Sequence, residues 1–265
     1  MSDLTASALR RLKSRGQAAA VGTTRGRDPA SGLPLPPRLL RAGGTHFRTD
    51  ADYLAAARKD ARRLADLGRL HRDTRLLDLG CGSGRLAIGV AAQVGPMRSY
   101  CGIDVDPAAI RWANRHLAPR AGFMRFLRID VYNARYNPSG PPLDEAFRLP
   151  VDDEAVDTVY AYSLFSHMVA SDVGVYLSEI SRVLTAAGGA VFTAFVEDDV
   201  PDQVINPAGY GGWLGGALHC VRFGRGYFDG LLAAAGLAVT DFHHGGETDG
   251  QSLYVVSPHG VAAPG

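Results

Sequence analysis

A short glycine-rich turn between an apolar strand and a helix constrains this chain more than any other feature. The segment LLDLGCGSG occupies residues 76–84, and a helical pattern of apolar residues follows it. In α/β folds a glycine turn at this place lets a ligand approach the backbone amides at the start of the helix, because glycine has no side chain in the way. The sequence therefore predicts a nucleotide-type ligand site directly after the first core strand.

Strand-like and helical segments alternate along the chain after residue 49. We expect strands at 75–79, 100–104, 123–129, 156–162, 190–195, 237–242 and 252–256, and helices at 50–67, 84–93, 107–117, 173–184 and 225–235. Short apolar strands separated by helices of about ten residues are typical of a parallel sheet covered on both faces. The prediction is an α/β fold with a doubly wound, mostly parallel sheet of seven strands.

The two ends of the chain and two long insertions differ from this alternating region. Residues 1–48 contain nine Arg or Lys but only two acidic residues, and residues 26–37 are rich in Gly and Pro. Such a segment is expected either to be a mobile basic arm or to fold over the mouth of an active site. We predict one domain at 49–258, with lid-like insertions at 132–149 and 197–224, and a tail at 259–265.

Composition and charge exclude several classes of partner. The 28 basic and 27 acidic side chains give a net charge of +1, so the chain lacks the positive field that attracts nucleic acids or anionic lipids. No apolar segment is long enough for a membrane span, and the N-terminus does not resemble a secretory signal. The three cysteines have no paired spacing. We expect a cytoplasmic enzyme with a small-molecule substrate, and nothing in the sequence indicates its oligomeric state.

The spacing of the glycines distinguishes between two kinds of cofactor. The dinucleotide fingerprint is G-x-G-x-x-G, whereas Gly80, Gly82 and Gly84 give G-x-G-x-G. Arg85 stands where the third glycine of the fingerprint belongs. The turn therefore does not fit a dinucleotide.

From this turn onward the chain resembles the class I S-adenosylmethionine-dependent methyltransferase superfamily. The first motif of that superfamily is an acid, an apolar residue and G-x-G-x-G, which residues 78–84 match. The segments IDVDP at 103–107 and IDV at 129–131 resemble the ends of its second and third strands. Later segments resemble its fourth and fifth strands. The resemblance implies a Rossmann-like sheet with an antiparallel last strand and S-adenosylmethionine as cofactor, with Asp104 binding the ribose and Asp130 the adenine. The residues implied to bind the cofactor are Asp78, Gly80, Cys81, Gly82, Gly84, Asp104, Val105, Asp130, Val131 and Ser163.

The chemistry of methyl transfer directs attention to the segment after the fourth strand. Transfer to a hydroxyl releases a proton, and His167 in this segment is the first candidate for a general base. Tyr136 is the second catalytic candidate. It lies in a YNP segment that is similar to one in bacterial methyltransferases associated with the modification of sugars and natural products. A structural hydrogen bond for His167 and a loop held by its own Asx turns are the alternatives. We expect O-methylation of a sugar-like or natural-product acceptor.

Other functions remain open. The same pocket could support cyclisation, elimination, or N- or C-methylation in secondary metabolism, and a partner-binding module is a third possibility. The acids at 197–199 and the cluster of His243, His244, Glu247 and Asp249 lack a recognised metal-ligand spacing, so no metal is expected. Tyr210 and Trp213 are expected to lie in the second insertion, as part of a lid over the acceptor.

Overall fold

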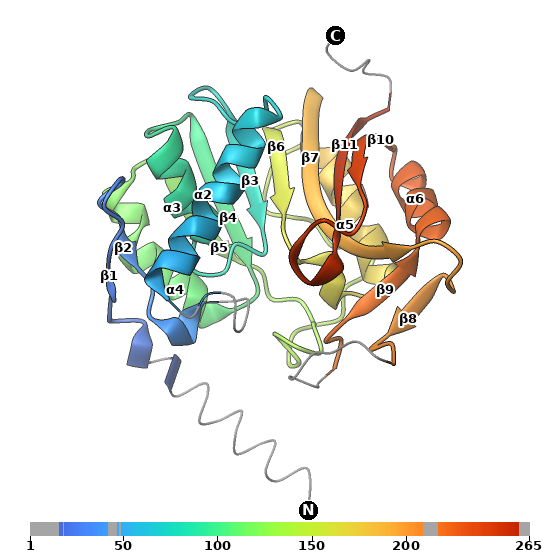
Figure 1. The fold of residues 1–265 in the computed structure, drawn as a ribbon, viewed down its shortest axis with the longest axis horizontal. Helices are drawn as coiled ribbons and strands as arrows, with labels where there is room; N and C mark the ends of the chain where they lie inside the picture. Colours follow the sequence, from blue (N-terminus) through green and yellow to red (C-terminus); the bar gives the residue numbers. More distant parts are fainter. Residues whose placement is uncertain (1–15, 18, 42–46, 48, 209–216, 260–265) are drawn as a thin grey trace, which may run out of the picture. The chain divides into compact units, whose positions relative to one another are not determined.

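Two compact units make up the chain in a computed structural model, which describes residues 16–17, 19–41, 47, 49–208 and 217–259 (Figure 1). One unit comprises residues 1–73 and 81–128, and the other comprises residues 74–80 and 129–265. The glycine turn therefore begins in the second unit and continues into the first. The domain boundaries expected at residues 48 and 258 stay predictions.

The first unit contains the helices and strands that surround the glycine turn. Its elements are β1 (Gly26–Arg27), β2 (Pro34–Leu35), η1 (Arg38–Leu40), α2 (Asp50–Asp66), α3 (Arg85–Gln93), β4 (Ser99–Asp104), α4 (Pro107–His116), η3 (Ala118–Arg120) and β5 (Met124–Arg128). Strands β4 and β5 pair in parallel, and α2 packs beside α3 (Figure 1). Local signals fix the helix starts: Thr49 caps α2, whereas Asp106 caps α4 with Pro107 in its first turn.

The described part of the basic N-terminal segment is folded. Strands β1 and β2 form an antiparallel pair. Asp28, which is fully buried, pairs with Arg58 of α2 at 2.5 Å, and Nε1 of Trp112 in α4 donates to the carbonyl of Thr23 at 2.7 Å. Residues 23–41 are thus held by buried polar contacts to two helices of their own unit.

The second unit contains most of the sheet. Its elements are β3 (Arg75–Leu79), β6 (Val156–Ala161), η4 (Phe165–His167), α5 (Ala170–Val183), β7 (Leu184–Glu197), β8 (Gln203–Ile205), β9 (Val221–Gly224), α6 (Arg225–Ala234), β10 (Leu237–His243), η5 (Thr248–Gly250) and β11 (Ser252–Pro258). The order is β10-β11-β7-β6-β3, with β3, β6 and β7 parallel and β11 antiparallel to both neighbours. All seven predicted strands are present, and the predicted fold class is confirmed.

The insertion at 197–224 extends this sheet. Strand β9 pairs in parallel with β7, and β8 pairs antiparallel with β9 (Figure 1). The sequence analysis read this segment only as a loop, because β8 and β9 are too short to show a periodic pattern. Tyr210 and Trp213 lie outside the described residues, so the lid remains a prediction.

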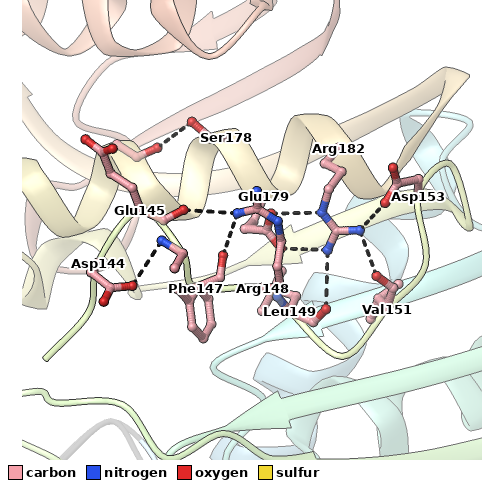
Figure 2. A network of polar contacts seen from close by, with 12 residues as sticks. Asp144, Glu145, Phe147, Arg148, Leu149, Val151, Asp153, Ser178, Glu179 and Arg182 are labelled. Carbon is pink, nitrogen blue, oxygen red and sulfur yellow. Dashed lines mark hydrogen bonds and ion pairs between the residues drawn. The ribbon is translucent and has the colours of Figure 1, made fainter. Parts of the chain in front are cut away.

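The insertion at 132–149 is anchored to α5 by one buried acid. Glu179, only 2% exposed, accepts the backbone N–H of Leu149 at 2.7 Å and pairs with Arg182 at 2.6 Å. Arg182 also donates to the carbonyl of Val151 and to Asp153, so one guanidinium ties the end of the insertion to the helix (Figure 2). The buried carboxylate and its donors satisfy one another.

Candidate functional site

The glycine turn forms a tight bend at the start of α3. The N–H of Cys81 donates to Ile103 at 3.1 Å, and the N–H of Gly84 donates to Cys81 at 2.9 Å. Gly84 has a φ of 86°, which residues with side chains rarely adopt, and a Cβ here would lie 2.5 Å from Cδ1 of Leu117. The turn therefore needs glycine both for its conformation and for its packing.

Asp104 ends β4 and binds this turn directly. Its carboxylate accepts the N–H of Gly82 at 2.7 Å and that of Asp106 at 2.8 Å. Burial raises the pKa of Asp104 to about 6, while these hydrogen bonds oppose the rise. A carboxylate has about four acceptor positions, and the backbone of Val105 also bonds to Asp104, so a position remains for a ribose hydroxyl. The structure thus brings Asp104 together with the predicted residues Cys81, Gly82 and Gly84.

A close contact behind the turn involves Gly102, which the sequence analysis missed. A Cβ on Gly102 would lie 2.8 Å from both Sγ of Cys81 and Cδ1 of Phe126. Cys81, Cys101 and Cys220 are buried, and none of them is in a disulfide. Val105, the other predicted residue here, accepts Nε of Arg128 through its carbonyl at 3.3 Å. Cys81 can contribute only its backbone to a ligand, because its side chain packs inward against Gly102.

The remaining predicted cofactor residues belong to the second unit. Asp78 is 4% exposed and lies opposite Tyr160 of β6, and Gly80 follows β3 with a φ of 76°. Asp130 is held by Nδ2 of Asn137, which donates to it at 2.9 Å and to the carbonyl of buried Val131 at 2.8 Å. The YNP segment therefore fixes the carboxylate of Asp130, a role that sequence spacing alone did not reveal.

Ser163 follows β6 in a strained conformation. Its φ of 55° is uncommon for a residue with a side chain. Its N–H donates to Oγ1 of Thr193, its hydroxyl accepts Nε2 of Gln251, and Thr193 donates to Gln251, each at 2.8 Å. The partners come from β7 and from the residue just before β11, so no local pattern in the sequence predicts them. The three side chains hold the backbone after β6 in this conformation.

His167 lies in η4 with its ring orientation fixed. Its Nδ1 lies 3.0 Å from the carbonyl oxygen of Leu218, and a carbonyl can only accept, so Nδ1 carries the hydrogen and Nε2 keeps a lone pair. Burial is the main cause that lowers the pKa of His167 to about 4. The ring of Tyr136 meets that of His167 edge to face, with centroids 5.6 Å apart. The structure thus brings the two catalytic candidates together within one unit.

The acids at 197–199 and the cluster of His243, His244, Glu247 and Asp249, both considered for metal binding, share one pair, and His243 pairs with an acid outside both. Glu197 pairs with His244 at 3.1 Å, and His243 pairs with Asp241 at 2.9 Å. Among the described residues, no three His, Cys, Asp or Glu side chains are arranged to hold a metal ion. A search of the same residues finds no helix with the length and apolarity that a membrane crossing requires.

The central region of the chain matches the model of a known protein family. Residues 77–191 match the family described as "Methyltransferase domain". This range is less than half of the chain, and it contains the glycine turn, Asp104, Asp130 and His167. The match supports the resemblance to the class I methyltransferase superfamily.

Solved structures with the same fold perform different reactions. The [4+2]-cyclase SpnF is 24% identical, with a TM-score of 0.52, over 72% of this chain and 61% of that chain. The 1,6-didemethyltoxoflavin-N1-methyltransferase of Burkholderia thailandensis, solved with S-adenosylhomocysteine, is 20% identical, with a TM-score of 0.51, over 77% and 79%. The mitomycin 7-O-methyltransferase MmcR is 16% identical, with a TM-score of 0.52, over 77% and 53%. This chain thus spans less than two thirds of the cyclase and of MmcR, and these likenesses establish the methyltransferase fold.

Proposed function

We propose that this chain is an S-adenosylmethionine-dependent methyltransferase that acts on a hydroxyl group of a small acceptor. The observation that carries the proposal is the bond from Gly82 to the half-buried carboxylate of Asp104. It places an acid that still has an acceptor position against a turn in which Gly84 has a φ of 86° and no room for a Cβ. This donor and acceptor set fits an adenosyl ribose, because a ribose offers hydroxyl donors.

The remaining predicted residues complete the proposed cofactor contacts. Asp130, held by Asn137, would accept the amino group of the adenine, and the resemblance implies Val131 and Val105 as further cofactor residues. Asp78, the glycines 80, 82 and 84, the backbone of Cys81, and Ser163 would surround the methionine part. When bound, the cofactor supplies a methyl group on a cationic sulfonium, which needs alignment with the acceptor more than covalent help from the protein.

His167 would remove the proton that the acceptor hydroxyl loses. Its Nδ1 hydrogen is engaged with Leu218, so Nε2 is the atom that would accept the proton. Tyr136, whose ring packs edge to face on His167, would keep that ring in place and border the acceptor. A small acceptor, sugar-like or a natural product, is in keeping with the net charge of +1 and with the two tyrosines exposed in the loop, Tyr132 and Tyr136.

Calorimetry and mass spectrometry test the proposal. S-adenosylhomocysteine should bind the full chain, whereas NAD⁺ should not, because the turn lacks the third glycine of the dinucleotide fingerprint. Incubation with S-adenosylmethionine and a panel of hydroxylated acceptors should give a product heavier by one methylene equivalent. A product of unchanged mass would instead point to cyclisation, as in the cyclase of the same fold. Absence of S-adenosylhomocysteine binding at millimolar concentration would overturn the proposal.

A further inference from the structure

A positively charged side chain lies beside the candidate base. Arg135 places its guanidinium over the ring of Tyr136, 5.5 Å from the centroid, and Tyr136 in turn packs on His167. The charge of Arg135 acts on His167 and on His219, and in both cases it lowers the pKa of the imidazole. An enzyme that uses His167 as a base gains nothing from this repulsion alone.

Hydrogen bonds of Asn133 and Asn137 hold the loop that carries Arg135 in a defined conformation. Asn133, 6% exposed, accepts the N–H of Arg135 and that of Tyr136 through Oδ1, each at 3.0 Å. Its Nδ2 donates to the carbonyl of His167 at 3.1 Å, so one buried amide joins the loop to η4. Asn133 and Asn137 also exchange backbone hydrogen bonds at 3.1 and 2.9 Å. The position of Arg135 relative to His167 is therefore fixed by hydrogen bonds.

No acidic side chain pairs with Arg135 in the part of the chain that the structure describes. Asp249 supplies negative charge nearby, which acts to raise the pKa of His219 and that of Cys220. Arg222 acts to lower the pKa of Cys220. Nε of Arg222 is itself buried without a hydrogen-bond partner among the described residues. Arg135 thus acts on His219 and Arg222 on Cys220, and Asp249 acts on both residues with the opposite sign.

We propose that Arg135 binds an anionic group, a carboxylate or a phosphate, that the acceptor carries close to the hydroxyl to be methylated. This inference rests on the proposed function and narrows it, because it names the class of acceptor. A guanidinium is planar and binds either anion through paired N–H donors, and the ring centroid of Tyr136 lies 5.5 Å from the guanidinium of Arg135. The anion would also offset the charge of Arg135 and so raise the pKa of His167 as the acceptor binds, although the larger effect of burial would remain.

Matched small probes test the anion site without any need for turnover. Benzoate, phenyl phosphate and the neutral benzamide are titrated into the full chain at pH 7, and binding is followed by the NMR signals of the histidine side chains. The signal of His167 is identified as the one that disappears in the variant His167→Gln. We expect benzoate or phenyl phosphate to bind at least about tenfold more tightly than benzamide, because a charge-assisted hydrogen bond is gained. The tighter of the two anions identifies the group.

Two variants distinguish a specific site from general anion binding. Arg135→Gln should abolish the preference for the anion, and Arg135→Lys should keep part of it. Arg225→Gln is the matched control, because Arg225 also lies over an aromatic ring, that of Phe242, but already has a carboxylate neighbour in Asp229. It should leave the preference unchanged. Equal binding of benzamide and both anions, or an unchanged preference in Arg135→Gln, would overturn the inference.

Failure of this inference is distinguishable from failure of the proposed function. The probes bind in the absence of S-adenosylmethionine, and no methyl transfer is measured. A second readout is the titration midpoint of His167 in sulfate compared with chloride at equal ionic strength. Sulfate should raise the midpoint by about one pH unit in the wild-type chain and not in Arg135→Gln. An equal shift in both proteins would also overturn the inference.

Discussion

The Nδ1 atom of His167 lies 3.0 Å from the carbonyl oxygen of Leu218, and this bond fixes the tautomer of the imidazole. A carbonyl accepts and does not donate, so the hydrogen stays on Nδ1 and the lone pair on Nε2. Leu218 lies between β8 and β9, within the insertion at 197–224. The insertion therefore determines which nitrogen of His167 is available to an acceptor.

The first prediction concerns the reaction. His167→Gln should lower kcat about 100-fold or more, because a general base is lost, while the affinity for S-adenosylhomocysteine stays unchanged. Tyr136→Phe is the control: it keeps the edge-to-face ring contact and should retain most of the rate. Rates and calorimetry on both variants decide the matter. A His167→Gln enzyme with an undiminished rate would remove His167 from the chemistry.

The second prediction concerns stability and pH. The pKa of His167 is lowered from 6.5 to about 4, so the unfolded chain binds the proton more tightly than the folded one. The stability due to this group is complete above pH 6.5 and is lost as the pH falls toward 4. Urea unfolding between these values should show the wild-type chain losing more stability on acidification than His167→Gln. Parallel curves for the two proteins would contradict the prediction.

The third prediction concerns cofactor binding. The pKa of Asp104 is raised to about 6, so its carboxyl group becomes protonated below that pH and loses acceptor positions. The affinity for S-adenosylhomocysteine should therefore fall as the pH drops through 6. Asp104→Asn should bind S-adenosylhomocysteine about 10- to 100-fold more weakly than the wild-type chain at pH 8. Its affinity should depend little on pH, because the amide that replaces the carboxyl group does not titrate. Thermal unfolding checks that the variant is folded.

The sequence predicted the fold better than the detailed contacts. The apolar strands and helix caps are local signals, so β3, β4 and α4 lie close to their predicted bounds. The fifth strand is predicted only at 190–195, whereas β7 runs from Leu184 to Glu197, with a register shift against β6 before Gly189. Glycines there weaken the local strand signal, but the pairing of Gly189 with Thr158 of β6 overrides it.

Contacts between residues far apart in sequence account for what the sequence left undetermined at the site. The bond between Thr193 and Gln251 spans 58 positions, and that between Gln251 and Ser163 spans 88. The need for glycine at position 102 could not be predicted from sequence, because it comes from the side chain of Cys81. Cys81 lies 21 positions earlier in the chain, in the glycine turn, and packs against Gly102. Single-residue patterns do not encode such pairs, whereas the glycine spacing at 80–84 is local and was recognised.

The fourth prediction separates conformation from packing at the glycine turn. Gly84→Ala should destabilise the fold by about 2–3 kcal/mol, because alanine is strained at a φ of 86° and its Cβ meets Leu117. Gly95→Ala is the matched control: φ there is 76°, but nothing lies within 4 Å of the added Cβ. It should cost only about 1–2 kcal/mol. Chemical denaturation measures both values, and equal losses would mean that Leu117 moves aside without cost.

The last prediction concerns the buried acid of α5. Glu179→Gln should destabilise the chain by about 3 kcal/mol, because it leaves Arg182 and the N–H of Leu149 facing a neutral amide in a buried place (Figure 2). The pKa of Glu179 is lowered by Arg182 and Leu149 against the effect of burial, so its contribution is complete above the ordinary carboxyl range and is lost as the pH falls.

Arg148→Gln is the control for this change. Arg148 lies 3.6 Å from the same carboxylate, but its side chain is 63% exposed. Exposed ion pairs contribute about 1 kcal/mol or less. If removing Arg148 costs as much as Glu179→Gln, the stability comes from the ion pair at the surface. If only Glu179→Gln is costly, the buried bonds to Arg182 and Leu149 are what hold the end of the 132–149 insertion, and with it the loop of Asn133 and Arg135, on α5.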